Sequence, residues 1–113
     1  NLFYIDEDFE RLRKINAMTS IVTTVVVSYV DEKFTDENVT DGANWSRSNV
    51  SGYYLTGDSA GNLYYSDYSY YAVIKLEKSS GRVLAIAGNG TCAYGGELVV
   101  ATSSGVYVPT GLA

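Results

Sequence analysis

The strongest constraint on the fold is an internal repeat. Residues 1–6 (NLFYID) return as residues 62–67 (NLYYSD), and the spacing of 61 residues then continues without a gap. Leu12 matches Val73, Lys14 matches Lys75, and Val22 matches Val83 along it. Identity and residue class agree in one register. The sequence therefore predicts one structural unit that occurs twice.

Each copy divides into short apolar segments separated by polar turns. In the second copy we expect strands at residues 50–56, 62–66, 72–77 and 82–87, and in the first at residues 2–5, 11–16 and 21–27. Eleven tyrosines and many β-branched residues also favour strands. The chain is therefore predicted to be all-β, built of four-stranded antiparallel meanders like the blades of a β-propeller. A β-sandwich with two similar hairpins is the alternative.

The repeat also suggests how the chain is divided. Residues 1–27 correspond to a blade that lacks its first strand, and residues 50–88 to a complete blade. Residues 109–113 match residues 50–54, so residues 106–113 are expected to form the first strand of a further blade. Because the chain starts at Asn1 and not at methionine, we expect it to be a piece of a longer protein.

The second copy resembles an NHL repeat. The resemblance is carried by NLYYSD at residues 62–67, VIKL at 73–76, SGRV at 80–83 and AGNGT at 87–91. The Asn-His pair of that family is replaced by Tyr70 and Tyr71 here, and by Phe9 and Glu10 in the first copy.

NHL propellers usually have six blades. The resemblance therefore implies that two blades close a ring only by oligomerisation or as part of a longer chain. Three copies would supply six blades, so we expect a homotrimer in which residues 106–113 are exchanged as a strand between neighbours.

Aromatic residues gather in the loops of one rim of the predicted blades. The loop between the second and third strands and the loop between blades lie on the same rim, because strand direction alternates. Exposed rings there could stack on a protein or a carbohydrate, or could simply pack neighbouring blades together. The candidate ligand rim consists of Phe9, Trp45, Tyr68, Tyr70 and Tyr71.

The residue types present give little support for a catalytic site. The chain has no histidine and one cysteine, Cys92, which we expect to be a buried or half-buried structural thiol. Asp6 and Asp67 end equivalent strands, where a carboxylate typically accepts backbone hydrogen bonds in the following turn. The acidic segment 36–42 lacks the spacing of a calcium loop. We therefore expect no catalytic residue, no cofactor and no metal site.

These observations favour a non-catalytic binding or scaffold module whose ligand the sequence does not name. The alternative is a fragment of a propeller enzyme, such as a lyase or lactonase, whose catalytic residues lie outside this chain. A net charge of −5 disfavours nucleic acid, and no apolar stretch is long enough for membrane insertion. Four Asn-x-Ser/Thr sequons favour an extracellular or cell-surface location; they start at Asn38, Asn44, Asn49 and Asn89.

Overall fold

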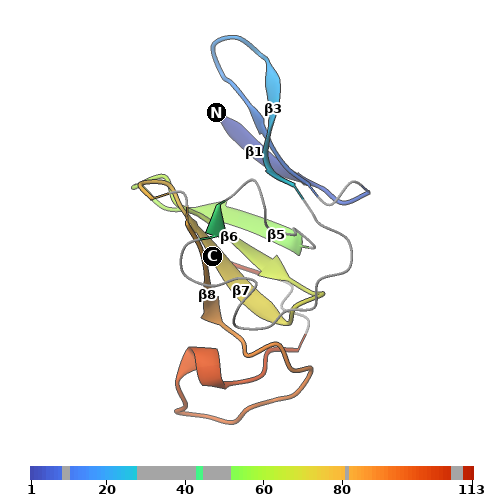
Figure 1. Cartoon of the computed structure of the whole chain (residues 1–113), viewed down its shortest axis with the longest axis vertical. Helices are drawn as coiled ribbons and strands as arrows, with labels where there is room; N and C mark the ends of the chain where they lie inside the picture. Colours follow the sequence, from blue (N-terminus) through green and yellow to red (C-terminus); the bar gives the residue numbers. More distant parts are fainter. Residues whose placement is uncertain (9–10, 28–42, 45–51, 81, 108–110) are drawn as a thin grey trace.

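The computed structural model describes residues 1–8, 11–27, 43–44, 52–80, 82–107 and 111–113. In these ranges the chain is all-β: its regular elements are antiparallel strands and one short 3-10 helix. The molecule is elongated, 46 × 31 × 24 Å, because its two sheets are stacked along the long axis (Figure 1). The strands predicted between residues 2 and 27 and between residues 50 and 87 are confirmed to within about two residues, whereas residues 106–107 and 111–113 lie in no strand.

The first sheet is a three-stranded antiparallel meander in the order β1-β2-β3. Its strands are β1 (Leu2–Asp6), β2 (Arg11–Ile15) and β3 (Val22–Val27). The turn between β2 and β3 is held by Asn16, whose side-chain oxygen accepts the N–H groups of Met18 at 2.9 Å and Thr19 at 3.1 Å. This type of side-chain turn is favoured by asparagine.

The second sheet contains the complete meander. Its strands follow the order β5-β6-β7-β8, and a two-residue strand, β4, pairs with β8 at the edge. Their bounds are β4 (Ala43–Asn44), β5 (Gly52–Gly57), β6 (Leu63–Asp67), β7 (Ala72–Glu77) and β8 (Arg82–Ala87). Strand β4 was not predicted, because two residues are too short to show alternation.

The repeat seen in the sequence governs strand pairing. All five pairs between β1 and β2 reappear between β6 and β7 with 61 added to each number; Leu2 opposite Ile15, for example, becomes Leu63 opposite Leu76. The irregularity that follows Leu12 in the first sheet follows Val73 in the second. The two meanders are therefore equivalent in register as well as in sequence.

A repeated side-chain hydrogen bond fixes the same corner in each meander. The side-chain oxygen of Asn62 accepts the Lys78 N–H at 3.0 Å, and that of Asn1 accepts the Ala17 N–H at 3.2 Å. The donor and acceptor are each 61 residues apart in the two copies. An asparagine before the second strand of each meander thus ties that strand to the turn between the third and fourth.

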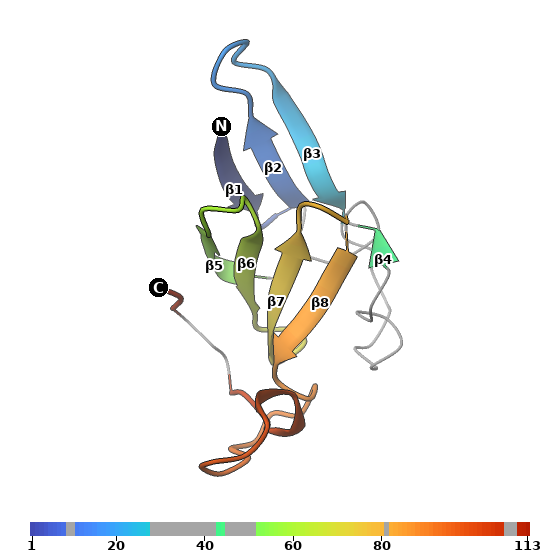
Figure 2. The same ribbon diagram turned by 90° about the vertical axis from the view of Figure 1, so that its left-hand side faces the viewer.

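The two sheets share one core. Leu12 of the first sheet is fully buried among Tyr65, Ile74, Leu76 and Val83 of the second, together with other apolar residues. Burial alternates along β7, where every second residue lies in this core. Packing therefore joins one face of each sheet (Figure 2).

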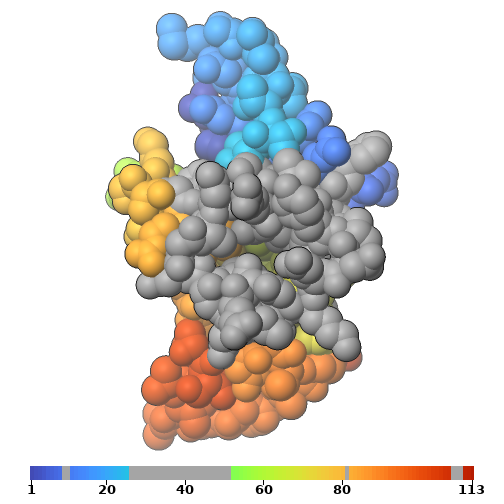
Figure 3. Space-filling view, in the orientation of Figure 1, coloured from blue at the N-terminus to red at the C-terminus, as the bar shows by residue number. Residues whose placement is uncertain are grey.

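The chain leaves β8 through a sharp bend into residues 88–107. Gly88 has φ +93°, and a Cβ at this position would lie 2.7 Å from the Ala72 Cα. Glycine meets both requirements, since it tolerates positive φ and has no Cβ. The Gly88 N–H donates to the Ala101 carbonyl at 2.9 Å, at the start of η2 (Ala101–Ser103). Residues 88–107 form one end of the molecule, opposite the β2–β3 turn (Figure 3).

Candidate functional site

Exposed tyrosines gather at the end of the molecule that holds the β6–β7 turn. Tyr68 in that turn stacks on Tyr53 at the start of β5, with ring centroids 4.7 Å apart and an interplanar angle of 22°. Tyr53 is 53% exposed, and Tyr68 is half-buried. The pair therefore offers a preformed aromatic surface to solvent.

Asp67 holds the turn that carries Tyr68. Its carboxylate is fully buried and accepts the N–H groups of Ser69 and Tyr70, both at 2.9 Å. This is the arrangement expected of a turn carboxylate at the end of a strand. Asp6 occupies the equivalent end of β1, opposite Arg11 as Asp67 lies opposite Ala72.

The residues of the candidate rim have different environments. Tyr70 is 8% exposed and belongs to the hydrophobic core, whereas Tyr68 and Tyr71 are half-buried near the surface. Phe9 and Trp45 lie outside the described residues. Of the five rim residues, Tyr68 and Tyr71 are thus the ones that the described structure brings to the surface of this end.

Tyr71 connects the β6–β7 turn to the segment after β8. A side-chain hydrogen bond with Cys92 raises the pKa of the Tyr71 hydroxyl, and the nearby Tyr107 hydroxyl acts in the same direction. Cys92 is exposed, so the expectation of a buried or half-buried thiol was wrong. The cysteine lies in the irregular segment beyond β8, where no sheet covers it.

Sequence reasoning missed part of this aromatic surface. Tyr94 and Tyr107 are strongly exposed in the segment after β8, and Tyr94 donates a hydrogen bond to the Glu97 carboxylate, which raises the tyrosine pKa. Counting the tyrosines in the segment after the last predicted strand of the second copy, as well as in the loop between its second and third strands, could have found them. We call the set the aromatic end; it comprises Tyr53, Tyr68, Tyr71, Tyr94 and Tyr107.

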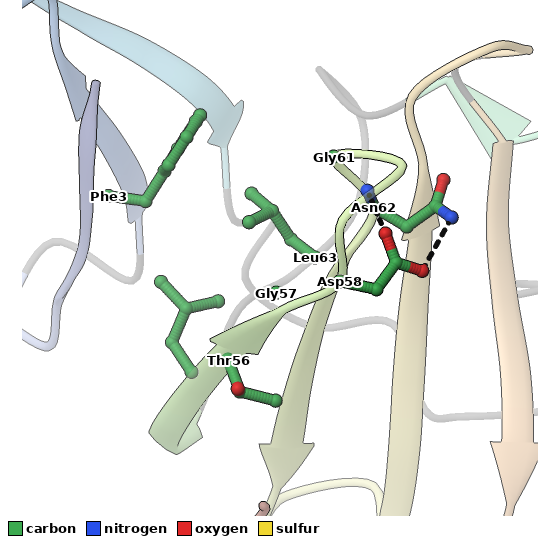
Figure 4. A pocket seen from close by; sticks show the side chains of 8 residues that line it. Phe3, Thr56, Gly57, Asp58, Gly61, Asn62 and Leu63 are labelled. Atoms are coloured by element: carbon green, nitrogen blue, oxygen red, sulfur yellow. Dashed lines mark hydrogen bonds between the residues drawn. The ribbon is translucent and has the colours of Figure 1, made fainter.

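A pocket of about 350 Å³ lies at the opposite end of β5, between β1 and the β5–β6 turn. Phe3 points from β1 toward Leu63 across this pocket (Figure 4). Its lining combines apolar side chains with the polar groups of the turn and consists of Phe3, Leu55, Thr56, Gly57, Asp58, Gly61, Asn62 and Leu63.

Asp58 is the carboxylate of this pocket, and the turn uses both of its oxygens. One oxygen accepts the Asn62 N–H at 2.9 Å, and the other accepts the Asn62 amide at 2.8 Å and the Tyr64 hydroxyl at 2.9 Å. The Asn62 side chain is the main cause that lowers the pKa of Asp58 to about 2. A carboxylate that stays ionised and hydrogen-bonded in this way is a turn-holding group and a poor general base.

The described ranges contain no cluster of three or more histidine, cysteine, aspartate or glutamate side chains suited to a metal ion. Within the same ranges, no helix has the length and apolar character needed to cross a bilayer. Among the described residues that line the pocket, Asp58 is the single carboxylate, and the titratable group beside it is the Tyr64 hydroxyl that donates to it. Comparison of the sequence with protein-family models and with curated proteins found no match.

Proposed function

We propose that this chain forms blades of an NHL-type β-propeller and acts as a non-catalytic binding or scaffold module. The support is the agreement between sequence and pairing, since the two meanders share register, strand irregularity and the asparagine corner under one shift of 61 residues. Face-to-face packing of consecutive meanders is the arrangement that a propeller requires.

Closure of such a ring needs more blades than this chain contains. We propose a six-bladed ring, made either by three copies as a homotrimer or by further blades of a longer chain. In the trimer, residues 106–113 would complete the first meander of a neighbour. Gly111–Ala113 and residues 106–107 make no strand pairing within their own chain, so this strand exchange stays a prediction.

The ligand surface in this proposal is the aromatic end, and the stacked Tyr53–Tyr68 pair carries the argument. Stacked rings lose little conformational entropy on binding, because packing already restricts their rotation. Tyrosine offers a flat apolar face and a hydroxyl, which together suit sugar rings and protein side chains. A protein or a carbohydrate is therefore the expected ligand class.

Two neighbouring tyrosines of β5 allow a matched test. Tyr53 is 53% exposed and Tyr54 is 50% exposed, but Tyr53 is the one that stacks on Tyr68. A glycan array and a displayed-peptide library would identify a ligand, and titration calorimetry would measure its affinity. We expect Tyr53→Ser to weaken binding at least about tenfold, the loss of one aromatic anchor, and Tyr54→Ser to leave it unchanged.

Equal loss in both variants would place the ligand elsewhere on the molecule. Failure of both libraries to yield a ligand would reject the binding role.

A further inference from the structure

The two meanders pack through faces that are not equivalent. We call the face of β5–β8 that lies in the core its front face; it carries Leu63, Tyr65, Ile74, Leu76 and Val83. The first meander, β1–β3, packs against this core through the side that is not equivalent to a front face. We call that side its back face; it carries Phe3, Ile5, Leu12 and Val25. The back face of the first meander therefore covers the front face of the second.

The 61-residue equivalence identifies the two faces that remain. The front face of β1–β3 carries Leu2, Tyr4, Arg13, Ile15 and Val22, and the back face of β5–β8 carries Tyr64, Ser66, Val73 and Ile86.

Both remaining faces leave apolar residues uncovered. Leu2 is 62% exposed and Val22 is 44% exposed, whereas their equivalents Leu63 and Val83 are 6% and 0% exposed. Ile86 is also exposed on the back face of β5–β8. Each remaining face thus has the pattern of its equivalent in the core, but no sheet of the described part of the chain covers it.

We infer that the back face of β5–β8 binds the front face of β1–β3 of a second copy of this chain. This inference rests on the proposal that the meanders are propeller blades, and it names the surfaces that meet. Such a contact is heterologous, because each partner contributes a different surface. It repeats between chains the packing that the structure already contains within one chain.

The two faces differ in charge. The front face of β1–β3 carries Arg11 and Arg13 beside Asp6, and the back face of β5–β8 carries Asp58 and Glu77 beside Lys75. Arg82 lies opposite Glu77 on the second surface, so the first surface has an excess of positive charge and the second carries two charges of each sign. Two front faces would bring like charges together, which disfavours the pairing of two identical front faces.

Each face also has a buried polar atom without a hydrogen bond. These atoms are the Nε of Arg13 on the front face and the Oγ of Ser66 on the back face. Buried polar groups in native proteins are normally paired, so these two atoms are exceptions, and both are already covered within the single chain.

The C-terminal residues mark where the second copy would lie. Leu112 and Ala113 line a pocket of about 310 Å³ on the back face of β5–β8, with Tyr64, Val73 and Ile86. In the first sheet, the equivalent region around Phe3 is lined by Leu55 and Thr56 of β5, the first strand of the following meander.

Residues 111–113 therefore occupy the place of a first strand on this face. In this chain β1 is an edge strand, because no strand pairs with it on the side away from β2. When β1–β3 of a second copy docks on this face, residues 111–113 would lie next to that open edge of β1. Pairing along that edge would add main-chain hydrogen bonds to the face contact.

Two lysine substitutions separate the two faces experimentally. Val22→Lys places a charge on the front face of β1–β3, and Ile86→Lys places one on the back face of β5–β8. Both positions are exposed in the single chain, so each variant should fold, which circular dichroism checks. Met18→Lys changes a strongly exposed residue of the β2–β3 turn, outside both faces, and serves as the control.

The expected result by analytical ultracentrifugation has three parts. Val22→Lys alone and Ile86→Lys alone should sediment as monomers, Met18→Lys should associate like the unchanged chain, and an equimolar mixture of the two face variants should form a one-to-one dimer. The dimer is expected because the mixture retains one intact face of each kind.

A mixture that stays monomeric, or a single face variant that still associates, would overturn the inference. Ligand binding through Tyr53 is measured on monomeric Ile86→Lys, so failure of the docking faces and failure of the binding role give separate results.

Discussion

Asp58 shows how one side chain can define a turn. Its carboxylate accepts three hydrogen bonds from Asn62 and Tyr64, while Asn62 in turn accepts the Lys78 N–H. One carboxylate and one amide thereby connect the β5–β6 turn to the β7–β8 turn. The amide half of this arrangement is repeated at Asn1.

The Asp58→Asn change should lower the free energy of unfolding at neutral pH. The pKa of Asp58 is lowered from 3.8 to about 2 in the folded chain, so its ionised form stabilises the fold above about pH 4. This contribution is lost as the pH falls toward 2. Urea unfolding across this range should therefore show a stability difference between the variant and the unchanged protein that shrinks below pH 4.

The control for this experiment is Ser59→Asn, which introduces an amide in the same turn and keeps the carboxylate. A difference between Asp58→Asn and the unchanged chain that stayed constant down to pH 2 would contradict the assignment.

Individual side chains were the least predictable feature of this protein. The polar turn at residues 57–61 was expected from composition, but the role of Asp58 depends on the path of the β5–β6 hairpin. Tyr70 and Tyr71 look alike in sequence, yet Tyr71 has φ +50° and lies near the surface while Tyr70 lies in the core. Alternation stops at a turn, so it cannot say which ring is buried.

Strands were predicted well because alternation and turn residues agree along each of them. In β7, every second residue is buried, as a strand with one covered face requires. The repeat strengthened the prediction, because a weak pattern in the first copy had a stronger equivalent in the second. Which face of each strand is covered depends on the neighbouring sheet and could not be predicted from one strand.

Leu76 and Ile15 provide a matched test of this difference. They are equivalent in register, but Leu76 is fully buried, whereas Ile15 is half-buried on the front face of β1–β3. Leu76→Ala should cost about 2–5 kcal/mol of unfolding free energy, the usual range for a buried leucine. Ile15→Ala should cost less than about 1.5 kcal/mol in the monomer, because little packing is lost.

Urea unfolding at low protein concentration measures both changes. Equal losses in the two variants would show that Ile15 is packed as closely as Leu76 within the single chain, contrary to the structure.

Assembly depends on the balance between buried area and the cost of association. Covering apolar surface contributes about 25 cal/mol per Å², and bringing two chains together costs about 4–15 kcal/mol. Whether the chains associate therefore depends on how closely the two faces fit. The faces that would meet are equivalent to two faces that already pack together in one chain. The sequence predicted the repeated unit. Which face of each meander packs against its neighbour could be seen only in the arrangement of the sheets.

The mass of the assembly in solution tests the six-bladed proposal. Multi-angle light scattering should give about three times the chain mass of 12.3 kDa at micromolar concentration. A tetramer or pentamer would keep the contact between unlike faces but remove the six-blade count. A stable monomer would contradict both the trimer and the docking faces.

Packing through unlike faces gives the chain a polarity, as in a polymer with distinct plus and minus ends. Each added copy repeats the rotation that relates the two meanders, so the size of that rotation decides whether growth stops. A rotation that is a whole fraction of a turn, with no rise along the axis, closes into a ring and is self-limiting, and one sixth of a turn per meander gives six blades. A rotation combined with a rise generates an open helix. The geometry built into a single interface thereby separates a soluble ring from a fibre.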